Sequence, residues 1–189
     1  MLDADLGGES DPLSPKAREW ANLFGVYSIE VSQYLLALGN APAYSSAFSE
    51  PMETERVRFP ATKDEKLFQE AIEIGVTLLN AWTLCVLEIG VWEEKAPGAP
   101  IGTASFTGNS VEFENGSRLN DLPSGLDELV ISSFPVFVRY LEDRKHLPLD
   151  AELARDIRVV AGAIASILCV QDKCDDVLKR IIAAPMMSF

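Results

Sequence analysis

The fold that this sequence predicts is decided by residues 62–95, TKDEKLFQEAIEIGVTLLNAWTLCVLEIGVWEEK. Thr62 and Glu65 have the spacing of a capping box, which predicts the start of one long helix. Its first half carries an apolar stripe at helical spacing, formed by Phe68, Ile72, Leu79 and Trp82. Its second half is apolar on nearly every side, so neighbouring helices or lipid must cover it. Asn80 and Glu88 are costly in hydrocarbon, and we therefore expect a central core helix and no membrane span.

Further helices are expected on both sides of this central one. Apolar residues at three- and four-residue steps predict a helix over 15–38 and another over 126–141, where Pro135 should kink or split it. Two more helices are expected near the end of the chain, one from Asp150 and one from about Asp172.

A short β-meander is predicted at residues 103–119, after the central helix. Turn signals at Gly108-Asn109 and at Asn115-Gly116-Ser117 separate runs of alternating polarity. The cross-strand pairs expected from these turns are Ala104 with Phe113, Phe106 with Val111, Phe113 with Leu119, and Glu114 with Arg118. Three short strands cannot stand alone, so their apolar face must pack on the helices.

The predicted fold is therefore mainly α. We expect residues 14–189 to form a single helical domain, a bundle of about five helices with the antiparallel meander 103–119 inserted after the central helix. Residues 1–13 are acidic and lack apolar periodicity, which predicts a disordered tail. Residues 41–60 hold three prolines and are expected to be a loop.

The charge of the chain is strongly negative. Its 189 residues carry 16 basic and 29 acidic side chains, a net charge of −13 with an isoelectric point near 4.4. All of the excess lies in residues 1–128, because residues 129–189 hold eight basic and eight acidic side chains. Such a surface repels phosphates and anionic lipid and attracts basic proteins. We therefore expect a basic protein partner, no direct nucleic-acid binding and no membrane binding.

The residues that could carry catalysis are few. His146 is the only histidine, and the basic neighbours Arg144 and Lys145 would keep it neutral, as on a solvated surface. Glu70 and Glu73 share one helix face and could begin a magnesium site, but the matching acidic pair on the next helix is missing. We therefore expect no catalytic residue, no metal site and no cofactor.

Glu88 interrupts an apolar run and has two interpretations. It either points outward at the end of the central helix or pairs with an arginine of the last long helix, such as Arg155 or Arg158. A catalytic carboxylate at this place would need further polar groups around it.

The densest acidic surface is expected at the end of the central helix and beside the meander. It gives the predicted partner-binding site, which consists of Trp92, Glu93, Glu94, Glu112, Glu114 and Asp121. The leading hypothesis is an acidic, non-enzymatic protein-binding module of inhibitor or immunity type. It would cover a basic surface of its partner, including one that binds nucleic acid, by charge complementarity or as a nucleic-acid mimic.

Two alternatives remain open on the sequence. One is a magnesium-dependent, all-α nucleotide hydrolase that uses Glu70 and Glu73, and the other is an adaptor or assembly subunit of unknown oligomeric state. The first fourteen residues lack the charge and apolar pattern of a secretory signal. The cysteines are sparse and odd in number, at Cys85, Cys169 and Cys174, which fits a reducing compartment, the cytoplasm.

Overall fold

The computed structural model describes residues 13–47, 59–131 and 134–187. These residues divide into two compact units, which are described separately. Unit 1 is formed by residues 1–76 with 173–189, and unit 2 by residues 77–172. The predicted tail 1–13 falls almost wholly outside the described residues, as does the larger part of the predicted loop 41–60. The prediction of a single domain stays a prediction.

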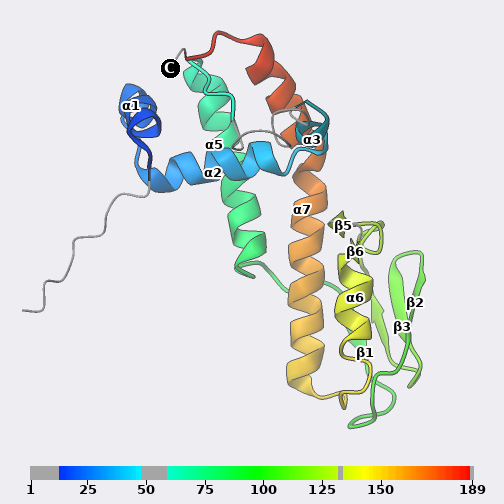
Figure 1. Cartoon of the computed structure of the whole chain (residues 1–189). Coiled ribbons are helices and arrows are strands. Elements are labelled where there is room, and N and C mark those ends of the chain that lie inside the picture. Colours follow the sequence, from blue (N-terminus) through cyan, green and yellow to red (C-terminus); the bar gives the residue numbers. More distant parts are fainter. Residues whose placement is uncertain (1–12, 48–58, 132–133, 188–189) are drawn as a thin grey trace, which may run out of the picture. The chain divides into compact units, whose positions relative to one another are not determined.

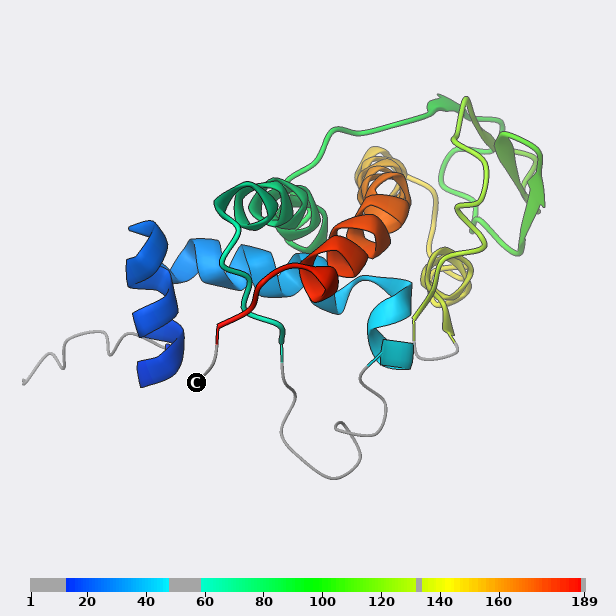
Figure 2. The same cartoon turned by 90° about the horizontal axis from the view of Figure 1, so that it is seen from above.

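Helices make up unit 1 (Figures 1 and 2). Its elements are α1 (Pro15–Phe24), α2 (Ser28–Gly39), α3 (Pro42–Ala47), the larger part of α5 (Glu65–Trp82) and the end of α7 (Ala151–Ala183). The helix expected over 15–38 is two helices, because Gly25 takes a left-handed conformation, with φ of 66°, and ends α1. Asp64, rather than a capping box, starts α5, because its carboxylate accepts from the backbone N–H groups of Lys66 and Leu67.

An aromatic cluster forms the core of unit 1. Trp20, Tyr34 and Phe68 are buried, and their rings meet with centroids 4.7 to 5.2 Å apart. The indole of Trp20 donates a hydrogen bond to the carbonyl of Thr62, and the hydroxyl of Tyr34 donates one to the carbonyl of Pro60. These bonds satisfy the polar ends of large buried side chains and fix the chain segment that leads into α5.

Unit 2 combines helices with two small sheets. Strands β1 (Val91–Glu93), β2 (Ala104–Thr107), β3 (Ser110–Phe113) and β4 (Arg118–Asn120) form an antiparallel sheet in the order β1-β4-β3-β2. Strands β5 (Val130–Ile131) and β6 (Phe134–Pro135) pair separately and lead into α6 (Val136–Glu142). The first hairpin has the predicted register, whereas β4 lies two residues from its expected place, with Glu112 opposite Arg118.

The prediction of a mainly α bundle is wrong. The described residues hold six helices, the four-stranded sheet and the two-stranded sheet, which is a mixed α/β architecture. The error began in the central helix, which ends at Trp82 instead of continuing to residue 95. Leu84 has φ of 56°, and the chain then runs extended into β1. A continuous apolar run that contains β-branched residues such as Val86, Ile89 and Val91 fits a strand as well as a helix.

At the other end of the chain, two expected helices are one. Helix α7 runs without interruption through Asp172, because the residues around it contain neither glycine nor proline. Among the described residues, no helix is both long enough and apolar enough to cross a membrane.

Candidate functional site

The four-stranded sheet of unit 2 has two faces of opposite character. Alternation along each strand puts one set of side chains against the interior of the unit, namely Trp92, Ala104, Phe106, Val111, Phe113 and Leu119. Helix α6 contributes to the cover of this face, because the rings of Phe106 and Phe137 meet edge to face with centroids 5.8 Å apart. The apolar face therefore fixes the sheet and leaves the other face free for contact.

The opposite face, called here the polar sheet face, is formed by Val91, Glu93, Ser105, Thr107, Ser110, Glu112, Arg118 and Asn120. Most of its side chains are short and project little from the sheet. Arg118 lies on β4, an inner strand. Glu112 of β3 and Glu93 of β1 are its partners in register on the two sides.

Arg118 is held by its acidic neighbours. Its Nη2 donates a hydrogen bond of 2.9 Å to Oε1 of Glu112, and 44% of the arginine side chain stays exposed. The hydrogen bond with Glu112, then the charges of Glu112 and Glu93, raise the pKa of Arg118 above its usual value. The Nζ atom of Lys95 lies 3.7 Å from Oε1 of Glu93. Lys95, Glu93, Arg118 and Glu112 thus form a row of two cations and two carboxylates. The row carries no net charge, in contrast to the chain as a whole.

The structure brings only part of the predicted partner-binding site together. Glu93 and Glu112 share the polar sheet face through Arg118. Trp92 is turned to the other face, where its ring meets Phe113 at a centroid distance of 5.3 Å. It therefore belongs to the packing of the sheet and is not an exposed aromatic anchor.

The other predicted site residues have separate surroundings. Glu94 lines a small pocket with Arg155 and Arg158. Glu114 accepts hydrogen bonds from the backbone and hydroxyl of Thr103, and these bonds lower its pKa. Asp121 follows β4 in a left-handed conformation, with φ of 57°. Whether any of the six residues binds a partner stays a prediction.

A basic turn, defined here as residues 144–146, lies at the β2 end of the sheet. The carbonyl of Lys145 accepts from the N–H of Gly102, just before β2. The guanidinium of Arg144 stacks over the ring of Tyr140, 3.8 Å from its centroid, while Lys145 pairs with Glu142 at 3.1 Å and His146 is exposed. The backbone of the turn is therefore attached to the chain just before β2.

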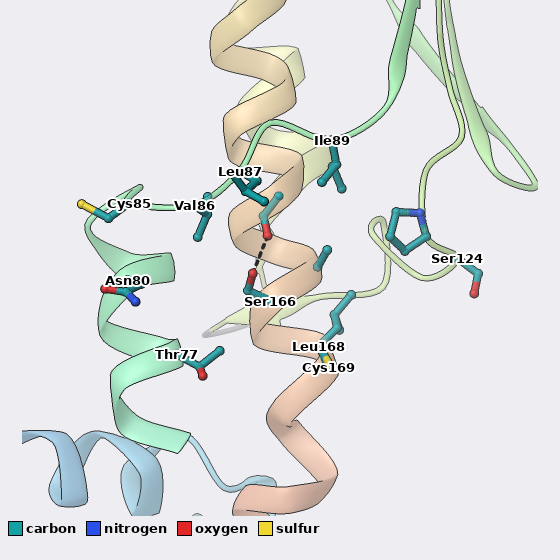
Figure 3. Close-up of a pocket in the computed structure, with 13 residues that line it drawn as sticks. Thr77, Asn80, Cys85, Val86, Leu87, Ile89, Ser124, Ser166, Leu168 and Cys169 are labelled. Carbon is teal, nitrogen blue, oxygen red and sulfur yellow. Dashed lines mark hydrogen bonds between the residues drawn. The ribbon is translucent and has the colours of Figure 1, made fainter. Parts of the chain in front are cut away.

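A groove of about 880 Å³ opens elsewhere in unit 2 (Figure 3). Thr77 and Asn80 project from α5, Ser166 and Cys169 from α7, and residues 85–89 cross above them. The hydroxyl of Ser166 is occupied, because it donates to the carbonyl of Gly162 at 2.8 Å. The described lining residues include no carboxylate, histidine, lysine or arginine, so the groove offers apolar contact and no acid or base apart from two thiols.

The two carboxylates that were considered as magnesium ligands have other partners. Glu70 pairs with Arg180 of α7, and Glu73 has a partner of its own. Within the described part of the chain, no three histidine, cysteine or acidic side chains are grouped so that they could hold a metal ion. Glu88 follows the second of its two interpretations, because it pairs with Arg155 at 3.2 Å and with Arg158 at 2.9 Å.

Arg118 and Asn120 were not among the predicted site residues, although Arg118 lies within the predicted meander and Asn120 directly follows it. The predicted register placed Arg118 opposite Glu114, at the turn, and the predicted site consisted of acidic residues and Trp92. Polar alternation over 105–120 could have found them, because the residues that face away from Val111 and Leu119 are all polar in β2, β3 and β4.

The sequence and the fold are similar to proteins of one kind. Residues 11–99, somewhat less than half of the chain, match the family model described as the Type ISP C-terminal specificity domain. No protein of curated function matches the sequence at a significant level.

The solved structures that share the fold include the following three. The ATP-dependent Type ISP restriction-modification enzyme LlaBIII bound to DNA has a TM-score of 0.55 at 12% identity, over 86% of this chain and 12% of that one. A nuclease-deletion mutant of the Type ISP enzyme LlaGI, in complex with a DNA substrate mimic, has a TM-score of 0.55 at 11% identity, over 87% and 17%. The DrdV–DNA complex has a TM-score of 0.58 at 10% identity, over 92% and 20%. This chain thus spans at most a fifth of the length of these proteins.

These findings correct the functional interpretation. The hypothesis of an inhibitor or nucleic-acid mimic is wrong, because the matching family model describes a specificity domain and two of the matching folds belong to Type ISP restriction-modification enzymes. The expectation of a basic protein partner without direct nucleic-acid contact is wrong for the same reason. That expectation rested on the net charge of the whole chain, which does not give the charge of one face of one sheet.

Proposed function

We propose that this chain is the DNA-recognition part of a restriction-modification enzyme and carries no catalytic step itself. The observation that carries the proposal is the match of residues 11–99 to a specificity-domain family. The likeness in fold to enzymes solved with DNA supports it over a larger part of the chain. Because the chain spans so little of those enzymes, we assign cleavage and modification to other polypeptide segments.

The polar sheet face carries side chains of the kinds that recognise bases. Such contacts are made mainly to base edges in the DNA major groove. Arg118 and Asn120 are two residues apart on one strand and one face. That spacing is about 6.8 Å, which corresponds to two base-pair steps of roughly 3.4 Å each. Arginine and asparagine are the side chains that recognise guanine and adenine in this groove.

The net charge of −13 determines what kind of DNA contact is possible. Affinity for any DNA sequence comes mainly from cations that neutralise phosphates, whereas discrimination between sequences comes from contacts to base edges. The described cations of the sheet region are largely paired, as Lys95, Arg118 and Lys145 show. We therefore infer that this chain supplies discrimination and little general affinity, and that the phosphate contacts are made by the rest of a larger assembly.

Two further expectations belong to this proposal. A non-catalytic role fits the lack of a carboxylate, histidine, lysine or arginine among the described residues that line the groove. The cytoplasm fits as the place of action, because exposed cysteines such as Cys85 and Cys169 suit a reducing compartment that also holds DNA.

The proposal is tested by selection from random DNA. The full chain is immobilised and incubated at low salt with a pool of duplexes that contain a randomised central segment, and the retained duplexes are sequenced over several rounds. We expect enrichment of one short motif. Retained duplexes with the same composition as the starting pool would contradict the proposal.

A further inference from the structure

One cationic side chain dominates the polar sheet face. Arg118 is its only lysine or arginine among the described residues of β1 to β4, and it lies on β4, one of the two strands that are paired on both sides. The residues beside it in β2 and at the far end of β3 are serine and threonine, which do not reach as far as an arginine. Arg118 and the two carboxylates that flank it, Glu112 and Glu93, are therefore the long exposed side chains of this face.

The guanidinium of Arg118 is held in place and still has N–H donors that are not bound to Glu112. Arginine has five N–H donors in a planar fork, and one of them is bound to Oε1 of Glu112. The Cα atoms of Glu112 and Glu93 flank that of Arg118 in register, so the side chain is confined between two carboxylates. This arrangement reduces the rotamer freedom that a free arginine would lose on binding and leaves donors for a second acceptor.

We infer that Arg118 recognises one guanine in the DNA major groove and that Glu112 holds its guanidinium in the recognition position. The inference rests on the proposed DNA-recognition function and assigns it to one side chain and one type of base. Guanine presents two acceptors, N7 and O6, side by side at its major-groove edge, and these match the arginine fork. No other base offers two acceptors in that arrangement.

A solvated ion pair that only stabilises the sheet is the competing explanation. Exposed cross-strand pairs of this kind contribute little to stability, and a lysine at position 118 would retain the pairing with Glu112. A lysine would lose the planar fork that binds N7 and O6 together. The variant Arg118→Lys therefore separates the two roles without changing the charge of the chain.

The matched control is Arg139→Lys. Arg139 is exposed, lies in the same unit and pairs with the carboxylate of Asp143 at 3.3 Å, but it is on α6 and outside the polar sheet face. Both variants and the wild type are put through the same selection from random duplexes, and binding to each selected duplex is then measured by fluorescence anisotropy. Melting temperatures of all three proteins verify that they fold equally well.

We expect Arg118→Lys to lose preference for G·C at a single position of the motif by roughly tenfold to a hundredfold, with the other positions unchanged. Arg139→Lys should select the wild-type motif. Glu112→Ala should relax the same position as Arg118→Lys, to a smaller extent, because the guanidinium is then less confined. An unchanged motif with Arg118→Lys would overturn this inference and leave the proposed function standing. Failure of the wild type to enrich any motif would overturn both.

Discussion

The carbonyl oxygen of Leu87 lies directly over Gly162 of α7, only 2.3 Å from the position that a β-carbon at residue 162 would occupy. The segment that follows α5 thus crosses α7 at the one residue without a side chain. The backbone N–H of Ile89 donates to the carbonyl of Arg158 one turn away and fixes the crossing. This contact shows why the chain leaves the helix after Trp82: residues 86–89 lie against α7 instead of continuing α5.

Substitution of Gly162 should therefore destabilise the chain. We expect Gly162→Ala to lower the free energy of unfolding by roughly 1–3 kcal/mol, because a backbone atom has to move to admit the methyl group. Urea unfolding followed by circular dichroism measures the effect. Gly39→Ala is the control, since its nearest neighbour is a flexible ring edge at 3.7 Å and alanine favours helix. Equal stability of Gly162→Ala and the wild type would contradict the crossing.

The two arginines that bind Glu88 should contribute unequally. Arg158 also donates to the carbonyl of Gly90 at 3.2 Å, and 33% of its side chain is exposed, against 72% for Arg155. We expect Arg158→Ala to cost about 1–2 kcal/mol and Arg155→Ala under about 0.5 kcal/mol, as measured by urea midpoints. The reverse order would mean that the segment 88–90 is held in another way.

Tyr34 should make the chain sensitive to alkaline pH. Its burial raises the pKa of the phenol above the ordinary value of 10.0. Unfolded tyrosine ionises near that value, so the stability due to Tyr34 is complete below pH 10 and is lost as the pH rises further. We expect Tyr34→Phe to be less stable at neutral pH by about 1 kcal/mol, because the bond to the Pro60 carbonyl is lost. Its stability should also fall less steeply above pH 10, and an equal slope for both proteins would contradict the assignment.

The three cysteines should differ in reactivity. Cys85 and Cys169 are exposed, whereas Cys174 is buried, and burial followed by the charge of Asp175 raises its pKa to about 11. A thiolate is the reactive form. We therefore expect an aromatic disulfide reagent to modify two thiols of the native protein at neutral pH and the third only in urea. Modification of Cys174 in the native protein at the rate of the other two would contradict its burial.

Local signals in the sequence predicted local structure well. Turn residues at Gly108-Asn109 gave the register of the first hairpin, because glycine at φ of 57° is what that turn requires. The pairing of Glu88 with arginines of α7 was one of the two interpretations that one charge within an apolar run allowed. Each of these inferences needed only neighbours in sequence or a single unpaired charge.

The elements that depend on distant contacts could not be predicted. The end of α5 is set by the crossing over Gly162, and strand β1 exists because β4 pairs with it. Neither Gly162 nor β4 is near these residues in sequence. Arg118 was missed for a related reason: net charge sums over the whole chain, whereas Arg118 lies beside a carboxylate that neutralises it locally.

The most direct test of DNA recognition is the ratio of two dissociation constants. Fluorescence anisotropy at one fixed salt concentration gives the constants of the full chain for the duplex selected from the random pool and for a duplex with the same bases in scrambled order. We predict tighter binding to the selected duplex by at least about tenfold, which corresponds to 1.4 kcal/mol. Equal dissociation constants for the two duplexes would contradict the account.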